Sequence, residues 1–218
     1  MGKLSRDVAF LKQIDILQFI YLNYICKSVV RKDGSKIVPY KHAVIDIAPS
    51  ARLFLQGGNL EIGGDALSGS RAETFLRIRE QAEWESAGGC RLSYGSTLEL
   101  LMGARLRSSY FTMNTGSTLV SAKEIRIGQD VMIARNAVIY DSDFHNIRDM
   151  EGKITNPPAG VVIGNHVWIG TGAIILKGTK IGQGTVIAAG TRISGNVEAG
   201  CICRNDGSRQ LQFGFWER

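Results

Sequence analysis

Isoleucine occupies every sixth position between residues 163 and 193, and the positions between follow a matching pattern. Within each six-residue unit the second residue is mostly Gly, Ala or Ser, and the fifth is small or β-branched. A six-residue period fits neither an α-helix nor a plain strand, but it fits a parallel β-helix, in which three short strands close one coil and successive coils pair through their backbones. The first and fifth positions then face the interior. The two inward sets are Ile163, Ile169, Ile175, Ile181, Ile187 and Ile193, and Val167, Ala173, Thr179, Thr185, Thr191 and Val197.

The same period extends upstream of this segment. Ile127, Ile133 and Ile139 are in phase with Ile163, and a weaker echo runs through Leu92 and Leu98. We therefore expect a mainly β chain whose tube occupies residues 37–200 in seven or eight coils, with the regular pattern starting near residue 44. Residues 201–218 are expected to form a tail.

Residues 1–36 differ from the rest, because apolar residues recur there at three- and four-residue steps, which predicts an amphipathic helix over 4–30 followed by a polar turn. Lys12, Asp15 and Lys27 interrupt the apolar run, so it is not a membrane span. Three roles stay open: capping the end of the tube, packing against a neighbouring chain, or lying on a membrane surface. The periodic residues are Leu4, Val8, Leu11, Ile14, Leu17, Tyr21 and Tyr24.

Composition narrows the class of protein. The chain is 44% apolar but only 8% aromatic, which suits a narrow tube filled by aliphatic side chains. The net charge of +6 is compatible with nucleic acid, an anionic membrane or a phosphorylated ligand, and the absence of any nucleic-acid-binding motif argues against the first. Without a secretory signal or a zinc-ligand spacing among the four cysteines, we expect reduced thiols and a cytoplasmic protein.

One polar excursion interrupts the regular repeat, over about residues 145–162, and it ends in Pro157-Pro158. A loop that leaves a rigid scaffold is a favoured place for chemistry. His145 opens the loop at a register position that would otherwise be aliphatic and inward, so we expect its side chain to turn outward into the mouth of the loop. The alternative is a corner histidine that is held by Asp141 or Asp143.

The segment D-x-D-F-H at 141–145, followed by V-x-I-G-N-H-V-W-I-G at 161–170, resembles the hexapeptide-repeat O-acetyltransferases of sugars and surface polysaccharides. The resemblance implies a left-handed β-helix, acetyl-CoA as acyl donor, and a homotrimer whose clefts lie between subunits. It implies transfer of an acetyl group to a sugar hydroxyl in surface polysaccharide biosynthesis, with no acyl-enzyme and no metal. The N-terminal helix would allow contact with the inner face of the membrane.

The chemistry gives each candidate residue a role. An alcohol becomes a good nucleophile when a base removes its proton, and imidazole can take that proton near neutral pH and return it to the leaving thiolate. We expect His145 to be that base, with Asp143 or Asp141 orienting it or holding the sugar. By resemblance, the backbone N–H of Thr171 stabilises the oxyanion.

Further candidates rest on the resemblance. Trp168 faces outward and would pack beside the active site or in a subunit interface, and His166 would serve the substrate or an interface. Asn114 resembles an asparagine near the acceptor. Acetyl-CoA would contact backbone along the later coils, with cations meeting its phosphates, although the tail R-N-D-G-S-R at 204–209 departs from the G-x-P-A-K usual in the family. The expected cofactor residues are Gly170, Thr171, Lys177, Ala189, Ser194, Arg204 and Arg209.

Three other readings compete with this one. An N-acetyltransferase acting on an amino sugar would share the mechanism, but the chain lacks the G-x-G-x-x-G of the first domain that such relatives commonly carry. A zinc enzyme like the γ-carbonic anhydrases would need three histidine ligands, and of His42, His145 and His166 the first lies several coils upstream. A non-catalytic β-helix scaffold would bind no acetyl-CoA.

Overall fold

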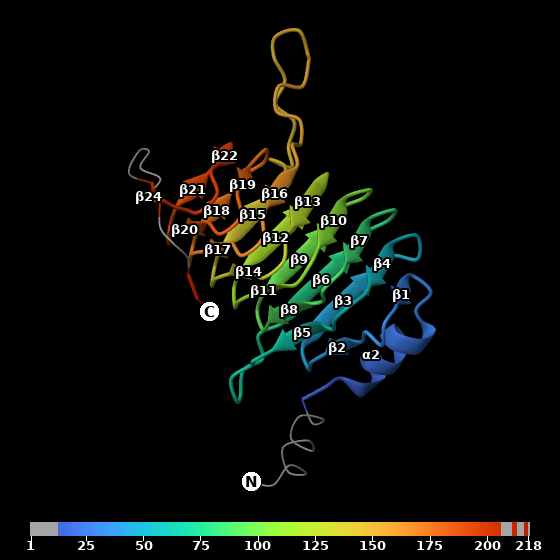
Figure 1. Ribbon diagram of the computed structural model, residues 1–218. Coiled ribbons are helices and arrows are strands. Elements are labelled where there is room, and N and C mark those ends of the chain that lie inside the picture. The colour runs from blue at the N-terminus through green and yellow to red at the C-terminus, as the bar shows by residue number, and fades with distance from the viewer. Residues whose placement is uncertain (1–12, 206–210, 213–215, 218) are drawn as a thin grey trace.

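The chain folds into a triangular tube of stacked coils, with a helical segment at one end and a long loop projecting from its side (Figure 1). The computed structural model describes residues 13–205, 211–212 and 216–217. Every strand pair within the tube is parallel, and each coil contributes one strand to each of three sheets. Seven complete coils and part of an eighth are present, as the sequence predicted.

The three faces of the tube are named here in the order in which the chain visits them. The first sheet contains β1 (Val29–Arg31), β4 (Arg52–Leu55), β7 (Glu83–Ser86), β10 (Arg105–Ser108), β13 (Glu124–Ile127), β16 (Val161–Ile163), β19 (Lys180–Ile181) and β22 (Asn196–Val197). The second contains β2 (Ile37–Pro39), β5 (Leu60–Gly64), β8 (Cys90–Ser93), β11 (Phe111–Met113), β14 (Val131–Ile133), β17 (Trp168–Ile169), β20 (Val186–Ile187), β23 (Cys201–Cys203) and the antiparallel β24 (Leu211–Gln212). The third contains β3 (Ala43–Ile47), β6 (Thr74–Ile78), β9 (Thr97–Leu100), β12 (Thr118–Ser121), β15 (Val138–Tyr140), β18 (Ile174–Ile175) and β21 (Arg192–Ile193).

Coil length explains why the repeat is clear only in the second half of the chain. Ile163 pairs with Ile181, eighteen residues later, which is three six-residue units. In the earlier coils Leu106 pairs with Ile125 after nineteen residues, and Trp84 with Leu106 after twenty-two. Residues 64–91, which look irregular in the sequence, therefore form ordinary strands in longer coils.

The interior of the tube is filled as the pattern predicted, since the six repeat isoleucines and the six fifth-position residues are all buried. The longer N-terminal coils also enclose aromatic side chains. Trp84 is fully buried 6.3 Å from the ring of Phe111, and its indole N–H donates to the Ser108 hydroxyl at 3.0 Å. Extra residues per coil thus widen the tube enough for an indole ring.

The N-terminal helix is shorter than predicted, and the part of the prediction over residues 4–12 lies outside the described residues. Helical structure comprises the α-helix α2 (Ile16–Ile20) and the π-helical turn η1 (Tyr21–Ile25). The chain extends at Cys26 and joins the first sheet at β1, so the tube begins before residue 37. At the other end β23 pairs with β20, so the tube also continues past residue 200.

The helical segment caps the open end of the tube, which is one of the three roles left open by the sequence. Leu22 is buried in the core cluster. The Asn23 side chain is buried as well, where its amide donates to Ile37 O at 2.7 Å and its oxygen accepts from Ile37 N at 2.9 Å. Asn23 thereby satisfies backbone groups at the end of the second sheet that a further strand would otherwise pair.

Candidate active site

The protruding loop leaves the corner between the third and first sheets, and it runs from the end of β15 to the start of β16, residues 141–160 (Figure 1). We call this edge of the tube the loop corner. The loop is a hairpin in which Arg148 and Ile154 form an antiparallel bridge and Thr155 N donates to Ile147 O at 2.8 Å. These bonds give the excursion a defined shape rather than that of a loose strand connection.

A polar network holds the base of the loop. Oδ2 of Asp143 accepts from Lys177 Nζ at 2.5 Å and from Asn156 Nδ2 at 2.8 Å. Nζ of Lys177 also donates to the backbone oxygen of Asn156, and Nδ2 of Asn156 donates to the backbone oxygen of His145. The hydrogen bonds from Lys177 and Asn156 lower the pKa of Asp143 below its ordinary value. Both strands of the hairpin are thus tied to the coil that follows β18.

His145 lies in the mouth of the loop with its side chain exposed, as expected from its register position. Phe144 precedes it with a φ of +61°, and the Phe144 ring packs edge-on against Tyr140 at 5.0 Å. Within the described parts of the chain the His145 imidazole makes no hydrogen bond, so both ring nitrogens face solvent. The expectation that Asp141 or Asp143 orients the ring is wrong for this structure, because the bonds of both carboxylates go elsewhere.

Asp141 has a structural role and is not open to a substrate. Its side chain is fully buried. The carboxylate accepts from Ser121 Oγ at 2.7 Å, Ala122 N at 2.6 Å and Lys123 N at 2.9 Å. These bonds anchor the preceding coil beneath the loop, so its prediction as a substrate-binding residue is corrected.

A second set of candidates lies on another edge of the tube. Backbone pairing through Met113, Ile133, Ile169, Ile187 and Cys203 stacks the residues that follow them along the corner between the second and third sheets. We call this edge the Gly170 corner. Along it lie Asn114, Ala134, Gly170, Ala188 and Arg204, with Thr171 and Ala189 beside them.

The Gly170 corner offers backbone rather than side chains. A Cβ on Gly170 would lie 2.6 Å from Ile187 O, so the coils approach too closely there for any side chain. The N–H of Thr171 has no acceptor among the described residues, whereas its C=O accepts from Gly190 N at 2.8 Å. This exposed N–H fits the expected oxyanion donor. Arg209 lies outside the described residues.

Lys177 and Ser194 are on the loop corner, away from the other expected cofactor residues, because Ile175 pairs with Ile193 immediately before them. Lys177 is engaged by Asp143 and Asn156, so it holds the loop instead of standing free for a phosphate. Ser194 is exposed. The structure thus divides the predicted cofactor residues between two corners.

Trp168 and His166 lie on or beside the second sheet, close to Trp216. Trp168 faces outward, as predicted, and is 38% exposed, with its ring 6.0 Å from that of Trp216. His166 is stacked on Trp216 at 4.0 Å, and its ring nitrogens contact Asp130 Oδ2 at 2.7 Å and Trp216 O at 2.9 Å. With both nitrogens engaged, His166 is occupied in holding Trp216 and is closed to a substrate in this structure.

The positions of the loop corner and the Gly170 corner decide which candidate residues can meet within one chain. In a triangular tube each corner lies opposite one face, and the loop corner lies opposite the second sheet, which carries Trp168. The Gly170 corner is separated from the loop corner by the full width of the third sheet. A single chain therefore keeps His145 apart from both Trp168 and Thr171.

Comparison with known proteins agrees with the repeat. Residues 160–195 match the family model described as bacterial transferase hexapeptide (six repeats). Residues 160–195 are a hexapeptide-repeat segment. The match covers the regular coils of eighteen residues together with the return of the loop into β16.

Two curated relatives that this chain matches are polysialic acid O-acetyltransferases. The one from Neisseria meningitidis is 42% identical over 69 residues, which is 31% of this chain and 32% of the relative. The one from Escherichia coli O1:K1 / APEC is 37% identical over 103 residues, 46% of this chain and 34% of the relative. The chain thus spans about a third of the length of the curated relatives that it matches, and the predicted resemblance to O-acetyltransferases is confirmed.

A crystal structure of the polySia specific acetyltransferase NeuO matches the whole architecture. It aligns with a TM-score of 0.52 at 21% identity and covers 88% of this chain and 89% of that one. At this identity the match speaks for the fold alone, and it confirms the predicted fold class, the left-handed β-helix.

The sequence did not point to two residues that shape the site. Asn156 links both strands of the loop, and the only signal was its place in the polar run before Pro157-Pro158. Asp130 holds His166 from the preceding coil, a partnership across 36 positions that no local motif reveals. The zinc reading finds no support in the described residues, which contain no cluster of three His, Cys, Asp or Glu side chains suited to a metal ion.

Proposed function

We propose that this protein is an acetyl-CoA-dependent O-acetyltransferase that acetylates a sugar hydroxyl during surface polysaccharide synthesis. The observation that carries the proposal is His145, an exposed residue whose imidazole has no hydrogen-bond partner among the described residues. It lies at the mouth of a loop whose base is held by Asp143, Lys177 and Asn156. Similarity to polysialic acid O-acetyltransferases supports a polysaccharide acceptor.

In the proposed reaction, His145 removes the proton from the acceptor hydroxyl as its oxygen attacks the thioester carbonyl carbon. The N–H of Thr171 donates to the oxyanion of the tetrahedral intermediate. When the C–S bond breaks, the imidazolium of His145 returns its proton to the leaving thiolate, and the acetyl group stays on the sugar oxygen. Asp143 acts on this reaction by positioning the loop, because its side chain is bonded to Lys177 and Asn156.

The proposal requires more than one chain, since the loop corner and the Gly170 corner of a single tube lie apart. We propose a homotrimer in which His145 of one chain faces Thr171 and Trp168 of a neighbour, a closed cyclic arrangement that repeats one heterologous contact three times. Acetyl-CoA would lie along the Gly170 corner, where Thr171 and Ala189 are exposed and Arg204 is an exposed cation. Because acetyl-CoA is made in the cytoplasm, we place the enzyme there.

The test is release of CoA thiol from acetyl-CoA in the presence of sugars and polysaccharide fragments. His145→Asn should lower turnover by about a hundredfold or more, the usual contribution of a general base, with acetyl-CoA binding retained. His42→Asn is the matched control, since His42 is an exposed histidine on the first coil. Equal turnover in the two variants would remove His145 from the mechanism, and amino sugars in the same panel test the N-acetyl alternative.

A further inference from the structure

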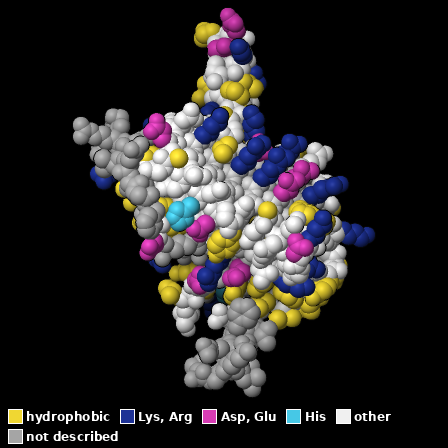
Figure 2. All heavy atoms as spheres, viewed as in Figure 1, with side chains coloured by type: hydrophobic (Ala, Val, Ile, Leu, Met, Phe, Trp, Pro, Cys, Tyr) yellow, Lys and Arg dark blue, Asp and Glu magenta, His cyan; other side chains and the backbone are white. Residues whose placement is uncertain are grey.

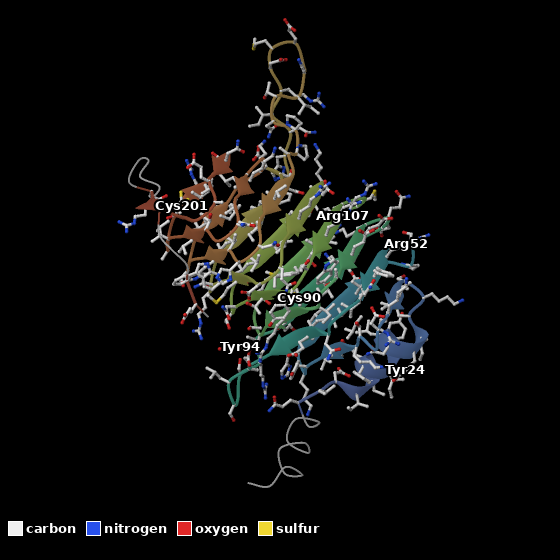
Figure 3. All side chains as sticks on the ribbon, viewed as in Figure 1. Tyr24, Arg52, Cys90, Tyr94, Arg107 and Cys201 are labelled. Atoms are coloured by element: carbon white, nitrogen blue, oxygen red, sulfur yellow. The ribbon has the colours of Figure 1, made fainter. Side chains whose placement is uncertain are left out.

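The capping segment at the N-terminal end of the tube exposes a group of large apolar side chains. Figure 2 shows hydrophobic side chains gathered where Figure 1 places α2, and Figure 3 labels Tyr24 within the same region. Leu17 is 81% exposed, Tyr24 66% and Ile25 62%. We call this group the end patch; its members are Ile16, Leu17, Ile20, Tyr21, Tyr24, Ile25 and Val30.

The end patch is distinct from the face that stabilises the fold. Leu22 and Asn23, on the opposite side of the segment, make the capping contacts with the tube. The capping contacts therefore explain one side of the helical segment, and they leave the exposed apolar side chains of the other side unexplained. A cluster of exposed apolar residues on a protein surface marks an interaction site.

Cations lie close to the ring of Tyr24 in the end patch and to that of Phe54 on the adjacent strand β4. Arg31 Cζ is 5.6 Å and Lys36 Nζ 5.3 Å from the centroid of the Tyr24 ring, and Lys32 Nζ is 5.2 Å from that of Phe54. Lys27 and Lys32 are exposed. Between residues 13 and 36 there are four Lys or Arg against two Asp. The partner must therefore present apolar surface together with negative charge.

We propose that the end patch docks the protein on an anionic lipid bilayer. Leucine and isoleucine side chains partition into the acyl boundary, tyrosine rings favour the headgroup level, and a cationic rim meets anionic headgroups. A second copy of the chain fits less well, because a symmetric contact through this patch would bring the same four cations of each copy together. Within the described residues no helix is long and apolar enough to cross a membrane, so the contact would be peripheral.

Docking by the end patch would set the distance between the loop corner and the bilayer. The patch is at the first coil, whereas the loop follows the fifth strand of the third sheet. With about 4.8 Å between coils, docking by the end patch would hold the loop corner roughly 20 Å from the bilayer surface if the tube stands upright. This inference does not depend on the reaction proposed above.

The experiment measures partitioning of the full-length protein onto vesicles by co-sedimentation. Vesicles of phosphatidylglycerol and phosphatidylcholine are compared with phosphatidylcholine alone, at low and high salt. The wild type should bind the anionic vesicles, and binding should weaken as salt screens the cations. Leu17→Ser combined with Tyr24→Ser should weaken binding by about tenfold, and Lys27→Glu combined with Lys32→Glu should do the same.

Two controls match these changes elsewhere on the surface. Leu67→Ser removes another highly exposed apolar side chain, and Lys153→Glu reverses an exposed charge in the loop, so both should bind as the wild type does. Thermal melting checks that each variant is folded. The proposal is overturned if the wild type does not bind anionic vesicles, or if the patch variants bind them as strongly as the wild type does. It is also overturned if the Leu17→Ser and Tyr24→Ser variant dissociates an assembly, since the patch is then a contact between copies.

Discussion

Lys177 Nζ lies 2.5 Å from Oδ2 of Asp143, and the bond joins the loop to a coil that begins after the loop has returned to the tube. The two residues are 34 positions apart. Because Lys177 also donates to the backbone oxygen of Asn156, one ammonium group fixes both strands where they leave the tube. The clamp thus fixes the base of the loop next to the backbone of His145.

Removing the clamp should affect turnover more than stability. We expect Lys177→Met to lower kcat by about tenfold, because the proposed general base loses its fixed position, while the melting temperature changes little, since an exposed ion pair contributes little to stability. Lys180→Met, an exposed lysine of the neighbouring strand β19, is the control. If acetyl-CoA affinity falls while kcat is unchanged, Lys177 contacts the donor as the sequence first suggested.

The clamp should also have a defined pH dependence. The pKa of Asp143 in the folded protein is lowered by its bonds to Lys177 and Asn156, so its contribution is present above the ordinary pKa of 3.8 and is lost as pH falls through the lower folded value. Amide exchange at Ile147 and Thr155, corrected for the intrinsic rate, should therefore be constant from pH 8 to pH 5. Loosening that begins above pH 5 would contradict this role of Asp143.

Asp141 should be required for folding rather than for substrate binding. Asp141→Ala leaves two backbone N–H groups and the buried Ser121 hydroxyl without their acceptor, so we expect a loss of about 3 kcal/mol in the free energy of unfolding. Asp143→Ala, at the exposed base of the loop, should cost much less. Urea unfolding of both variants makes the comparison, and a stable Asp141→Ala protein with raised KM for the acceptor would restore the substrate-binding role.

Close approach of coils at the Gly170 corner can be tested with a pair of glycines. Gly170→Ala places a Cβ 2.6 Å from Ile187 O and 2.7 Å from Ala189 N, so we expect it to lose about 2 kcal/mol through overpacking. Gly190→Ala adds only the strain of a φ of +69° in open space, about 1 kcal/mol. Equal melting temperatures for the two variants would show that the corner is less tight than described.

The sequence predicted the tube because a period of eighteen residues is visible wherever coils have that length. The spacing of the isoleucines from Ile163 to Ile193 therefore predicted the β-helix and its inward positions. It also predicted that His145 and Trp168 face outward. Trp84 was not recognised as an interior residue, since it stands in a coil of twenty-two residues that breaks the hexad spacing. The strands of this longer coil have four residues each, against two in the regular coils, so the hexad spacing cannot reveal its inward positions.

Within the described residues the helix prediction was right in kind but not in extent, and the reason is a different one. Three- and four-residue spacing finds an apolar face, but Leu17 and Tyr24, which carry that spacing, are exposed, and the polar Asn23 is buried against Ile37. The periodicity of apolar residues cannot reveal a polar side chain that bonds the backbone of an end strand in place of a further strand. Likewise, the tertiary bonds that engage Asp141 and His166 lie 18 to 50 positions apart, beyond the reach of local motifs.

The central claim is that each active centre combines His145 of one chain with Trp168 and Thr171 of another. The most direct measurement uses His145→Ala and Trp168→Ala chains, each inactive alone, co-expressed with different tags and purified through both tags to give only mixed trimers. In a cyclic trimer every mixed assembly has one interface in which both residues are intact, so activity should return to about a third of the wild-type value. Mixed trimers as inactive as either parent would contradict a shared site.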